Sequence, residues 1–213
     1  MPPILNAWIT ADDGQKIMLM RHGDVRTADD QKRFIGRTDL PLSPVGRRQA
    51  QAWQKRLAPL PLAGVACSDL SRCVETARIL AADRDLAVQS LPALREIDLG
   101  EWENLSFARV KARWPDAFQQ RGQDLARFRP PNGESFADLQ RRVVPAFERI
   151  VDQTAGPILI VAHAGVNRTI LCHILGLPLE NLFRLAQGSA ALTLIDRRAG
   201  GYRIRLLNLP PEP

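Results

Sequence analysis

The stretch Ile17-Met18-Leu19-Met20-Arg21-His22-Gly23 decides the fold class, because it joins a short apolar run to a charged break. Four apolar residues bounded in this way predict a buried strand. A histidine at the carboxyl end of such a strand stands where open α/β sheets place a ligand crevice. The arginine beside it can fork onto phosphate oxygens, and the glycine would let a backbone amide approach the same group. Alone, the stretch could also be a structural turn.

A second stretch repeats this pattern near the other end of the chain. Residues 157–165 run from an apolar strand into His163, which is followed by Ala164 and Gly165. The chain has three histidines, so two of them at matching strand ends are not expected by chance. Because the carboxyl ends of neighbouring parallel strands face one crevice, the sequence predicts that His22 and His163 meet there.

Length and composition suit one α/β domain with a sizeable core: 213 residues, 45% hydrophobic and 24% charged. No stretch approaches the roughly 20 apolar residues of a membrane span. The amino terminus lacks the basic start and apolar run of a secretory signal. Three cysteines, Cys67, Cys73 and Cys172, are a sparse, odd set that indicates a reducing compartment and small buried side chains. We therefore expect a cytoplasmic protein with no membrane partner.

The charge balance is basic, with a formal net charge of +6 and a pI near 9.9. The arginines are scattered and aromatic residues make up only 6% of the chain, which argues against nucleic-acid binding. Pairs such as Arg47-Arg48 and Arg141-Arg142 are expected on solvated helix faces. An anionic small molecule accounts for a local positive pocket equally well, so the expected partner is a small phosphorylated substrate, not nucleic acid.

Strand and helix signals alternate along the chain. Strands are predicted at 17–21, 64–68, 86–91 and 157–162, and helices at 43–57, 71–82, 135–152 and 165–175, with Ser43, Ser71 and Ser135 as helix caps. Two last strands flank Gly200-Gly201 as a hairpin, which could be a free edge or the interface of a homodimer. This order predicts a three-layer α/β/α fold with a mostly parallel central sheet. Residues 1–16 are expected to be a tail or an edge segment, and residues 17–213 a single domain.

Two polar segments interrupt the alternation. Residues 24–42 form a long loop, and residues 104–134 contain a short helix closed by Pro115 and a charged stretch. Loops of this length in a compact domain are usually functional or mobile. We expect residues 116–134 to cover the site and both segments to set specificity, which leaves the natural substrate open.

Seven motifs follow one another in a characteristic order over residues 17–196. They are Arg21-His22-Gly23, 36–43, 68–72 with 75–77, Leu94-Arg95-Glu96, 100–103, 132–135 and His163-Ala164-Gly165-Val166. The ordered set resembles the histidine phosphatase superfamily, which includes the cofactor-dependent phosphoglycerate mutases. It is most similar to the short bacterial branch of alpha-ribazole phosphatase and broad small-molecule phosphatases. The resemblance implies the phosphoglycerate mutase-like α/β fold and a phosphoric monoester hydrolase that needs no metal and no cofactor.

The resemblance also implies site roles. His22 would be the nucleophile that forms a phosphohistidine, and Arg21, Arg72 and His163 would bind the transferring phosphoryl group. Glu96 would protonate the leaving oxygen and then activate water. Thr27, Gly36 and Ala164 would contact substrate. Other carboxylates compete with Glu96 for the acid role: Asp98, Glu101 and Glu103.

Several positions depart from the family pattern. Asp24 stands where Glu is usual, Ala164 and Asn104 stand where Gly is usual, and residues 27–29 lack a phosphate-contacting Asn. The expected activity is hydrolysis of a small phosphate monoester, with alpha-ribazole phosphate as one candidate. A phosphoglycerate mutase is a second reading, although the longer mutase insertion between Glu96 and His163 is absent. A non-catalytic phosphate-binding module is a third, and it would need neither His22 nor Glu96.

Overall fold

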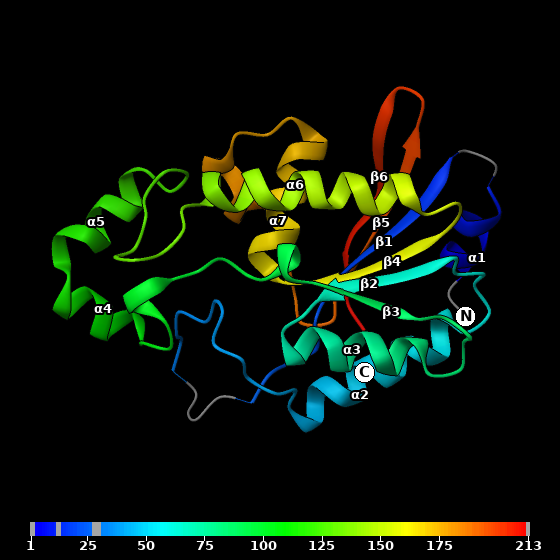
Figure 1. Cartoon of the computed structure of the whole chain (residues 1–213), viewed down its shortest axis with the longest axis horizontal. Helices are drawn as coiled ribbons and strands as arrows, with labels where there is room; N and C mark the ends of the chain where they lie inside the picture. Colours follow the sequence, from blue (N-terminus) through cyan, green and yellow to red (C-terminus); the bar gives the residue numbers. More distant parts are fainter. Residues whose placement is uncertain (1–2, 12–13, 27–30, 212–213) are drawn as a thin grey trace.

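A six-stranded sheet forms the middle layer in the computed structural model, which describes residues 3–11, 14–26 and 31–211. The strand order is β3-β2-β4-β1-β5-β6 (Figure 1). The strands are β1 Gln15–Arg21, β2 Gly64–Ser68, β3 Val88–Leu91, β4 Ile158–Ala162, β5 Leu192–Arg198 and β6 Gly201–Leu209. The first four pair in parallel, and β5 and β6 pair antiparallel as the predicted hairpin. The mostly parallel sheet is therefore confirmed.

Helices cover both faces of the sheet because both faces are apolar. Along β1, Ile17 and Leu19 pack into one core and Met18 and Met20 into the other. One face carries α6 and α7, and the opposite face carries α2 and α3 (Figure 1). These helices are α2 Pro44–Leu57, α3 Ser71–Ala81, α6 Phe136–Gln153 and α7 Ala164–Leu175. The three-layer architecture is confirmed. No helix of the described ranges is long and apolar enough to cross a membrane.

The amino-terminal segment differs from the predicted tail. Helix α1, Pro3–Thr10, packs on the same face as α2 and α3, with Leu5 fully buried and Trp8 6% exposed. The Trp8 indole donates a hydrogen bond to Asp196 Oδ1 at 2.7 Å. Residues 15 and 16 already belong to β1. The prediction failed because eight residues with two buried anchors give too little periodicity to distinguish a short helix from a tail.

Cap chemistry explains where the other helices begin. Ser43 accepts from the Gly46 amide at the start of α2, and α6 starts with a capping box between Ser135 and Asp138. Ser71 is the first residue of α3 and not its cap. Its amide and hydroxyl both donate to Asp39 Oδ1 at 2.8 Å, so a carboxylate from the long loop caps this helix.

The segment predicted as a cover projects beyond the sheet (Figure 1). It contains α4 Phe107–Arg113 and α5 Pro115–Gln123, and Pro115 opens α5 as well as closing α4. Short 3-10 helices flank the site: η1 Pro92–Leu94, η2 Gly100–Trp102 and η3 Leu179–Arg184. Phe34, Trp102 and Val110 form a separate small core under the cover. The cover is thus built on its own apolar cluster.

Candidate active site

Neighbouring strands bring the two histidines together. β1 and β4 pair in register with Arg21 opposite Ala162, so His22 and His163 follow side by side. The His22 amide donates to the Ala162 carbonyl at 3.0 Å. The two ring centres lie 5.2 Å apart, with the planes inclined at 64°. The predicted meeting of the histidines at one sheet edge is confirmed.

The surroundings of His22 select one tautomer of its ring and keep the ring neutral. Its Nδ1 lies 2.7 Å from the Gly23 carbonyl oxygen, which can only accept a hydrogen bond. Nδ1 therefore carries the hydrogen and Nε2 keeps a free lone pair. Burial lowers the pKa of His22 well below its ordinary value, and the charges of Arg21 and Arg72 lower this pKa further. The ring is neutral at pH 7.

Gly23 serves a purpose other than the predicted approach to phosphate. Its amide donates to Thr76 Oγ1 at 3.2 Å. A Cβ on Gly23 would lie 2.6 Å from the Gly46 carbonyl oxygen of α2. The glycine is needed because the chain after β1 passes directly against that helix.

Arg72 is locked in place from three directions. It follows β2 at the start of α3 and is 1% exposed. Its Nε donates to His163 Nδ1 at 3.2 Å, and its two terminal nitrogens donate to the carbonyls of Thr38 and Gly36 at 2.8 and 2.7 Å. The long loop therefore fixes the plane of the guanidinium against the second histidine.

His163 is fully buried between Arg72 and Ser68. Because Nδ1 accepts from Arg72, the ring hydrogen lies on Nε2, which donates to Ser68 Oγ at 2.8 Å. Cys73 Sγ lies 3.4 Å from the same nitrogen. Burial, and next the Arg72 charge, lower the pKa of His163 well below its ordinary value. Ser68 and Cys73 were not predicted to contact the site, since only the fold brings them to the ring.

Arg21 has an unused donor inside the site. Its Nη1 donates to the Gln187 carbonyl at 2.8 Å, while Nε is buried and has no partner among the described residues. Burial lowers the pKa of Arg21, and the Glu96 carboxylate acts against that shift. A buried donor without an acceptor is costly, so this nitrogen marks a place for an anion.

Glu96 lies at the amino end of α7, directly beyond His163. It is 7% exposed, and its carboxylate accepts from the amides of Ile97, Gly165 and Val166 at 3.0, 2.9 and 3.2 Å. Gly165 leaves the room for this, because a Cβ there would lie 2.5 Å from Glu96 Oε1. One helix end therefore fixes both Glu96 and His163.

The competing carboxylates are engaged elsewhere. Asp98 pairs with Arg37 at 2.9 Å, and Glu101 accepts from the Asn132 side chain at 3.1 Å. Glu103 accepts from the backbone amides of residues 36–38 and from the Thr38 hydroxyl. These contacts organise the loop that holds Arg72.

The structure describes two of the three residues that were predicted to contact substrate. Thr27 lies outside the described residues. The Gly36 amide donates to Glu103, and its carbonyl accepts from Arg72, so its backbone supports the arginine. Ala164 is half-buried as the first residue of α7. Contact of any of the three with substrate stays a prediction.

Arg142 was wrongly predicted on a solvated helix face. It forms a two-pronged pair with Glu134, both bonds 2.9 Å. It also donates to the carbonyls of Ala93, Arg95 and Glu96 at 2.8–2.9 Å. Arg142 lies three residues after the buried Leu139 on the same helix. This spacing places the two residues on one side of the helix and could have indicated that Arg142 faces the protein.

Apart from Cys73, which contacts His163, the cysteines and the third histidine are not among the described side chains that contact His22, His163 or Glu96. All three cysteines are buried, as predicted, and burial raises the pKa of Cys67 to about 11. His173 is exposed and lies 3.3 Å from Glu148. In the described part of the chain, no group of three or more His, Cys, Asp or Glu could hold a metal ion.

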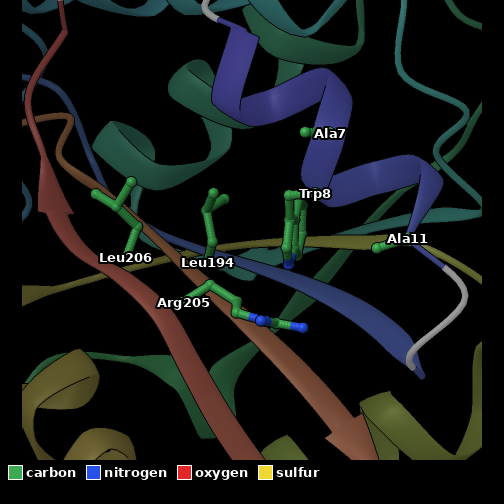
Figure 2. Close-up of a pocket in the computed structure, with 6 residues that line it drawn as sticks. All are labelled: Ala7, Trp8, Ala11, Leu194, Arg205 and Leu206. Atoms are coloured by element: carbon green, nitrogen blue, oxygen red, sulfur yellow. The ribbon is translucent and has the colours of Figure 1, made fainter.

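An apolar hollow of about 280 Å³ lies away from this site. Figure 2 shows Trp8 of α1 and Ala11, which follows that helix, on one side of it and Leu194, Arg205 and Leu206 of the hairpin on the other. None of the side chains around the histidines lines it. The hollow reflects the fit of α1 on the sheet.

Comparison with known proteins agrees with the fold. The histidine phosphatase superfamily (branch 1) matches residues 17–210, so the chain belongs to this superfamily. Its enzyme class is that of the phosphoric monoester hydrolases. Among the relatives, some are named phosphatases and differ in what their names say they act on, and others are named probable phosphoglycerate mutases.

Adenosylcobalamin/alpha-ribazole phosphatase of Escherichia coli is 29% identical over 91% of this chain and 95% of its own. Glucosyl-3-phosphoglycerate phosphatase of Mycolicibacterium vanbaalenii is 33% identical over 78% of this chain and 77% of its own. The crystal structure of the alpha-ribazole phosphatase from Shigella flexneri superposes with a TM-score of 0.83 at 28% identity, over 93% of this chain and all of that one.

Proposed function

We propose that this protein hydrolyses a small phosphate monoester in two steps, through a phosphohistidine formed at His22 Nε2. The observation that carries the proposal is the hydrogen bond of Nδ1 to the Gly23 carbonyl, which leaves Nε2 with its lone pair in a neutral ring. In the first step Nε2 bonds to phosphorus and the bond to the leaving oxygen breaks. Covalent transfer divides one difficult displacement into two easier ones.

Cationic and polar donors surround the place where the phosphoryl group would sit. Arg72 and His163 contact each other beside His22, and Arg21 brings an unpaired Nε. Phosphoryl transfer needs little from a protein besides positioning and stabilisation of charge on the phosphoryl oxygens. The two guanidinium groups meet that need, and His163, whose ring hydrogen is donated to Ser68, fixes Arg72 by accepting from its Nε.

Glu96 takes the role of proton donor and acceptor. It interacts electrostatically with Arg21, and it is fixed by the same helix end as His163. In the first step it gives a proton to the leaving oxygen. In the second step it takes a proton from water, whose oxygen bonds to phosphorus as the bond to His22 breaks.

Phosphate release from a panel of phosphate monoesters tests this proposal. The panel includes alpha-ribazole phosphate and 3-phosphoglycerate, and isomerisation of 3-phosphoglycerate is followed in parallel. We expect release that falls by at least about a thousandfold in His22→Ala. The matched control is His173→Ala, which alters an exposed histidine and should keep full activity.

Chemical trapping completes the test. Labelled substrate should leave a base-stable, acid-labile phosphoryl group on the wild type and none on His22→Ala. Isomerisation without phosphate release would establish a mutase. A folded wild type that binds phosphate analogues but neither labels nor releases phosphate would establish a binding module.

A further inference from the structure

An unbroken chain of hydrogen bonds runs through the ring of His163. The Arg72 guanidinium can only donate, so its contact from Nε to His163 Nδ1 at 3.2 Å makes Nδ1 the acceptor and leaves the ring hydrogen on Nε2. Ser68 Oγ lies 2.8 Å from that nitrogen. His163 is fully buried, so a ring hydrogen without an acceptor would be costly. The orientation of the ring therefore depends on the side chain that receives this hydrogen.

Ser68 in turn has to pass on its own hydrogen. Its Oγ accepts from His163 Nε2 and from the Leu70 amide at 3.3 Å, and these two donors occupy both lone pairs of the hydroxyl oxygen. Ser68 is fully buried, so its hydroxyl hydrogen needs an acceptor inside the protein. Cys73 Sγ provides it through a side-chain hydrogen bond with Ser68.

Cys73 ends the chain of hydrogen bonds at the backbone. Its Sγ donates to the Ala162 carbonyl at 3.4 Å, in the last residue of β4. Burial raises the pKa of Cys73 well above its ordinary value, so the thiol keeps the hydrogen that it donates. The same sulfur lies 3.4 Å from His163 Nε2. Each hydrogen between Arg72 Nε and the Ala162 carbonyl thus has one acceptor, and all of these bonds run in one direction.

The direction of the chain decides what His163 can do. Nδ1 accepts from Arg72 and the hydrogen of Nε2 is taken by Ser68, so the ring acts on a phosphoryl group through the arginine. We propose that Ser68 and Cys73 are positioning residues, which hold the hydrogen of His163 on Nε2 so that Nδ1 fixes the Arg72 guanidinium. The expected effect on turnover rests on the proposed phosphatase function, whereas the tautomer does not.

NMR of the protein with isotope-labelled histidines measures the tautomer without reference to activity. It distinguishes ring nitrogens that carry a hydrogen from those that do not, and the chain has three histidines. At pH 7 we expect the hydrogen on Nε2 in His163 and on Nδ1 in His22, which are opposite tautomers. His22→Gln and His173→Gln assign the signals. A hydrogen on Nδ1 of His163, or on both of its nitrogens, overturns the proposal.

Kinetics and anion binding measure the effect on Arg72. Ser68→Ala leaves the ring hydrogen without its acceptor, so we expect kcat/KM to fall by about tenfold or more and the Ki of orthovanadate to rise by the same factor. All substrates share the phosphoryl group, so the loss should be equal for alkyl and aryl phosphates. Ser68→Thr keeps the hydroxyl and should retain most of the activity. Cys73→Ser can still accept and donate, so it should be more active than Cys73→Ala.

Cys67→Ala is the matched control, because it removes a neighbouring buried thiol that bonds to Ser90. It should leave kcat/KM and Ki within about twofold of the wild type. The NMR signals of His22 show whether the site of each variant is folded. Unchanged kcat/KM and Ki in Ser68→Ala, or a loss confined to alkyl phosphates, overturns the proposal.

Calorimetry with orthovanadate keeps the two proposals separate. If the wild type releases no phosphate, the proposed hydrolysis fails, and the Kd of orthovanadate takes the place of Ki. A Kd that is about tenfold weaker in Ser68→Ala and restored in Ser68→Thr would then support the positioning role. An unchanged Kd in Ser68→Ala would overturn it.

Discussion

His22 illustrates how one backbone carbonyl selects a reactive nitrogen. The Gly23 oxygen lies 2.7 Å from Nδ1 and can only accept, so the lone pair is left on Nε2. Burial and two neighbouring arginines lower the pKa of the ring, so protonation does not remove the lone pair near neutrality. The same positive charges that would bind a phosphoryl group therefore also keep the nucleophile neutral.

The lowered pKa values of His22 and His163 make stability depend on pH. Below about pH 6.5 the unfolded chain protonates both histidines and the folded chain does not, so the free energy of unfolding falls as the pH drops. Each histidine contributes about 1 kcal/mol of loss between pH 7 and 5.5. In urea titrations, His22→Gln should lose about 1 kcal/mol less than the wild type over this range. A His22→Gln curve parallel to that of the wild type would contradict the assignment.

Replacing the Glu96 carboxyl group by an amide should lower kcat/KM most for substrates with poor leaving groups. In Glu96→Gln we expect kcat/KM for an alkyl phosphate to fall by about a hundredfold or more, since only this substrate needs protonation. The loss for p-nitrophenyl phosphate should be much smaller. Glu101→Gln, which alters an exposed carboxylate bonded to Asn132, is the control. Equal losses on both substrates in Glu96→Gln would move the acid role to another group.

At the scale of elements, α6 anchors the turn that carries Glu96. The Arg142 guanidinium donates hydrogen bonds to the backbone carbonyls of Ala93, Arg95 and Glu96. Its own position is fixed by its pairing with the Glu134 carboxylate. We regard Arg142 as a positioning residue, because it acts on the carboxylate through the backbone. The helix thus sets where the proposed proton donor lies without contacting its carboxylate.

Arg142→Met should therefore reproduce the leaving-group selectivity of Glu96→Gln. We expect a larger loss of kcat/KM for alkyl than for aryl phosphates, and less than additive losses in the double variant. The free energy of unfolding should also drop by about 1–3 kcal/mol, because three carbonyls lose a charged donor. Arg141→Met changes the exposed neighbour and should leave both activities unchanged. Equal losses on both substrates would reduce Arg142 to a general structural role.

Local signals were sufficient for the elements that build the sheet. Apolar runs, serine caps and the Gly200-Gly201 turn predicted the strands and long helices, and the strand-end rule predicted that His22 and His163 would meet. Contacts made by packing were not predictable in this way. Asp39 caps α3 from a distant loop, and Arg142 reaches the turn before Glu96 from another helix.

At the scale of the whole molecule, α1 lies outside the span matched by the superfamily and still completes a core. Trp8→Ala should lower the free energy of unfolding by about 3 kcal/mol or more, because a buried indole and its bond to Asp196 are lost. Trp8→Phe should cost less, about 1–3 kcal/mol. Thermal unfolding measures both, and kcat/KM at 25 °C should stay unchanged in each. A loss of activity at full folding would show that α1 also serves the site.

The pairing of β1 with β4 has a further consequence for how activity arises. Each strand contributes one histidine, and the chain between them includes the cover and most of the helices. A nascent chain that has not yet emerged from the ribosome past residue 163 therefore holds only half of the proposed catalytic pair. Two polypeptides divided within residues 124–134 would each carry one half, and hydrolysis would then act as a reporter of their reassembly.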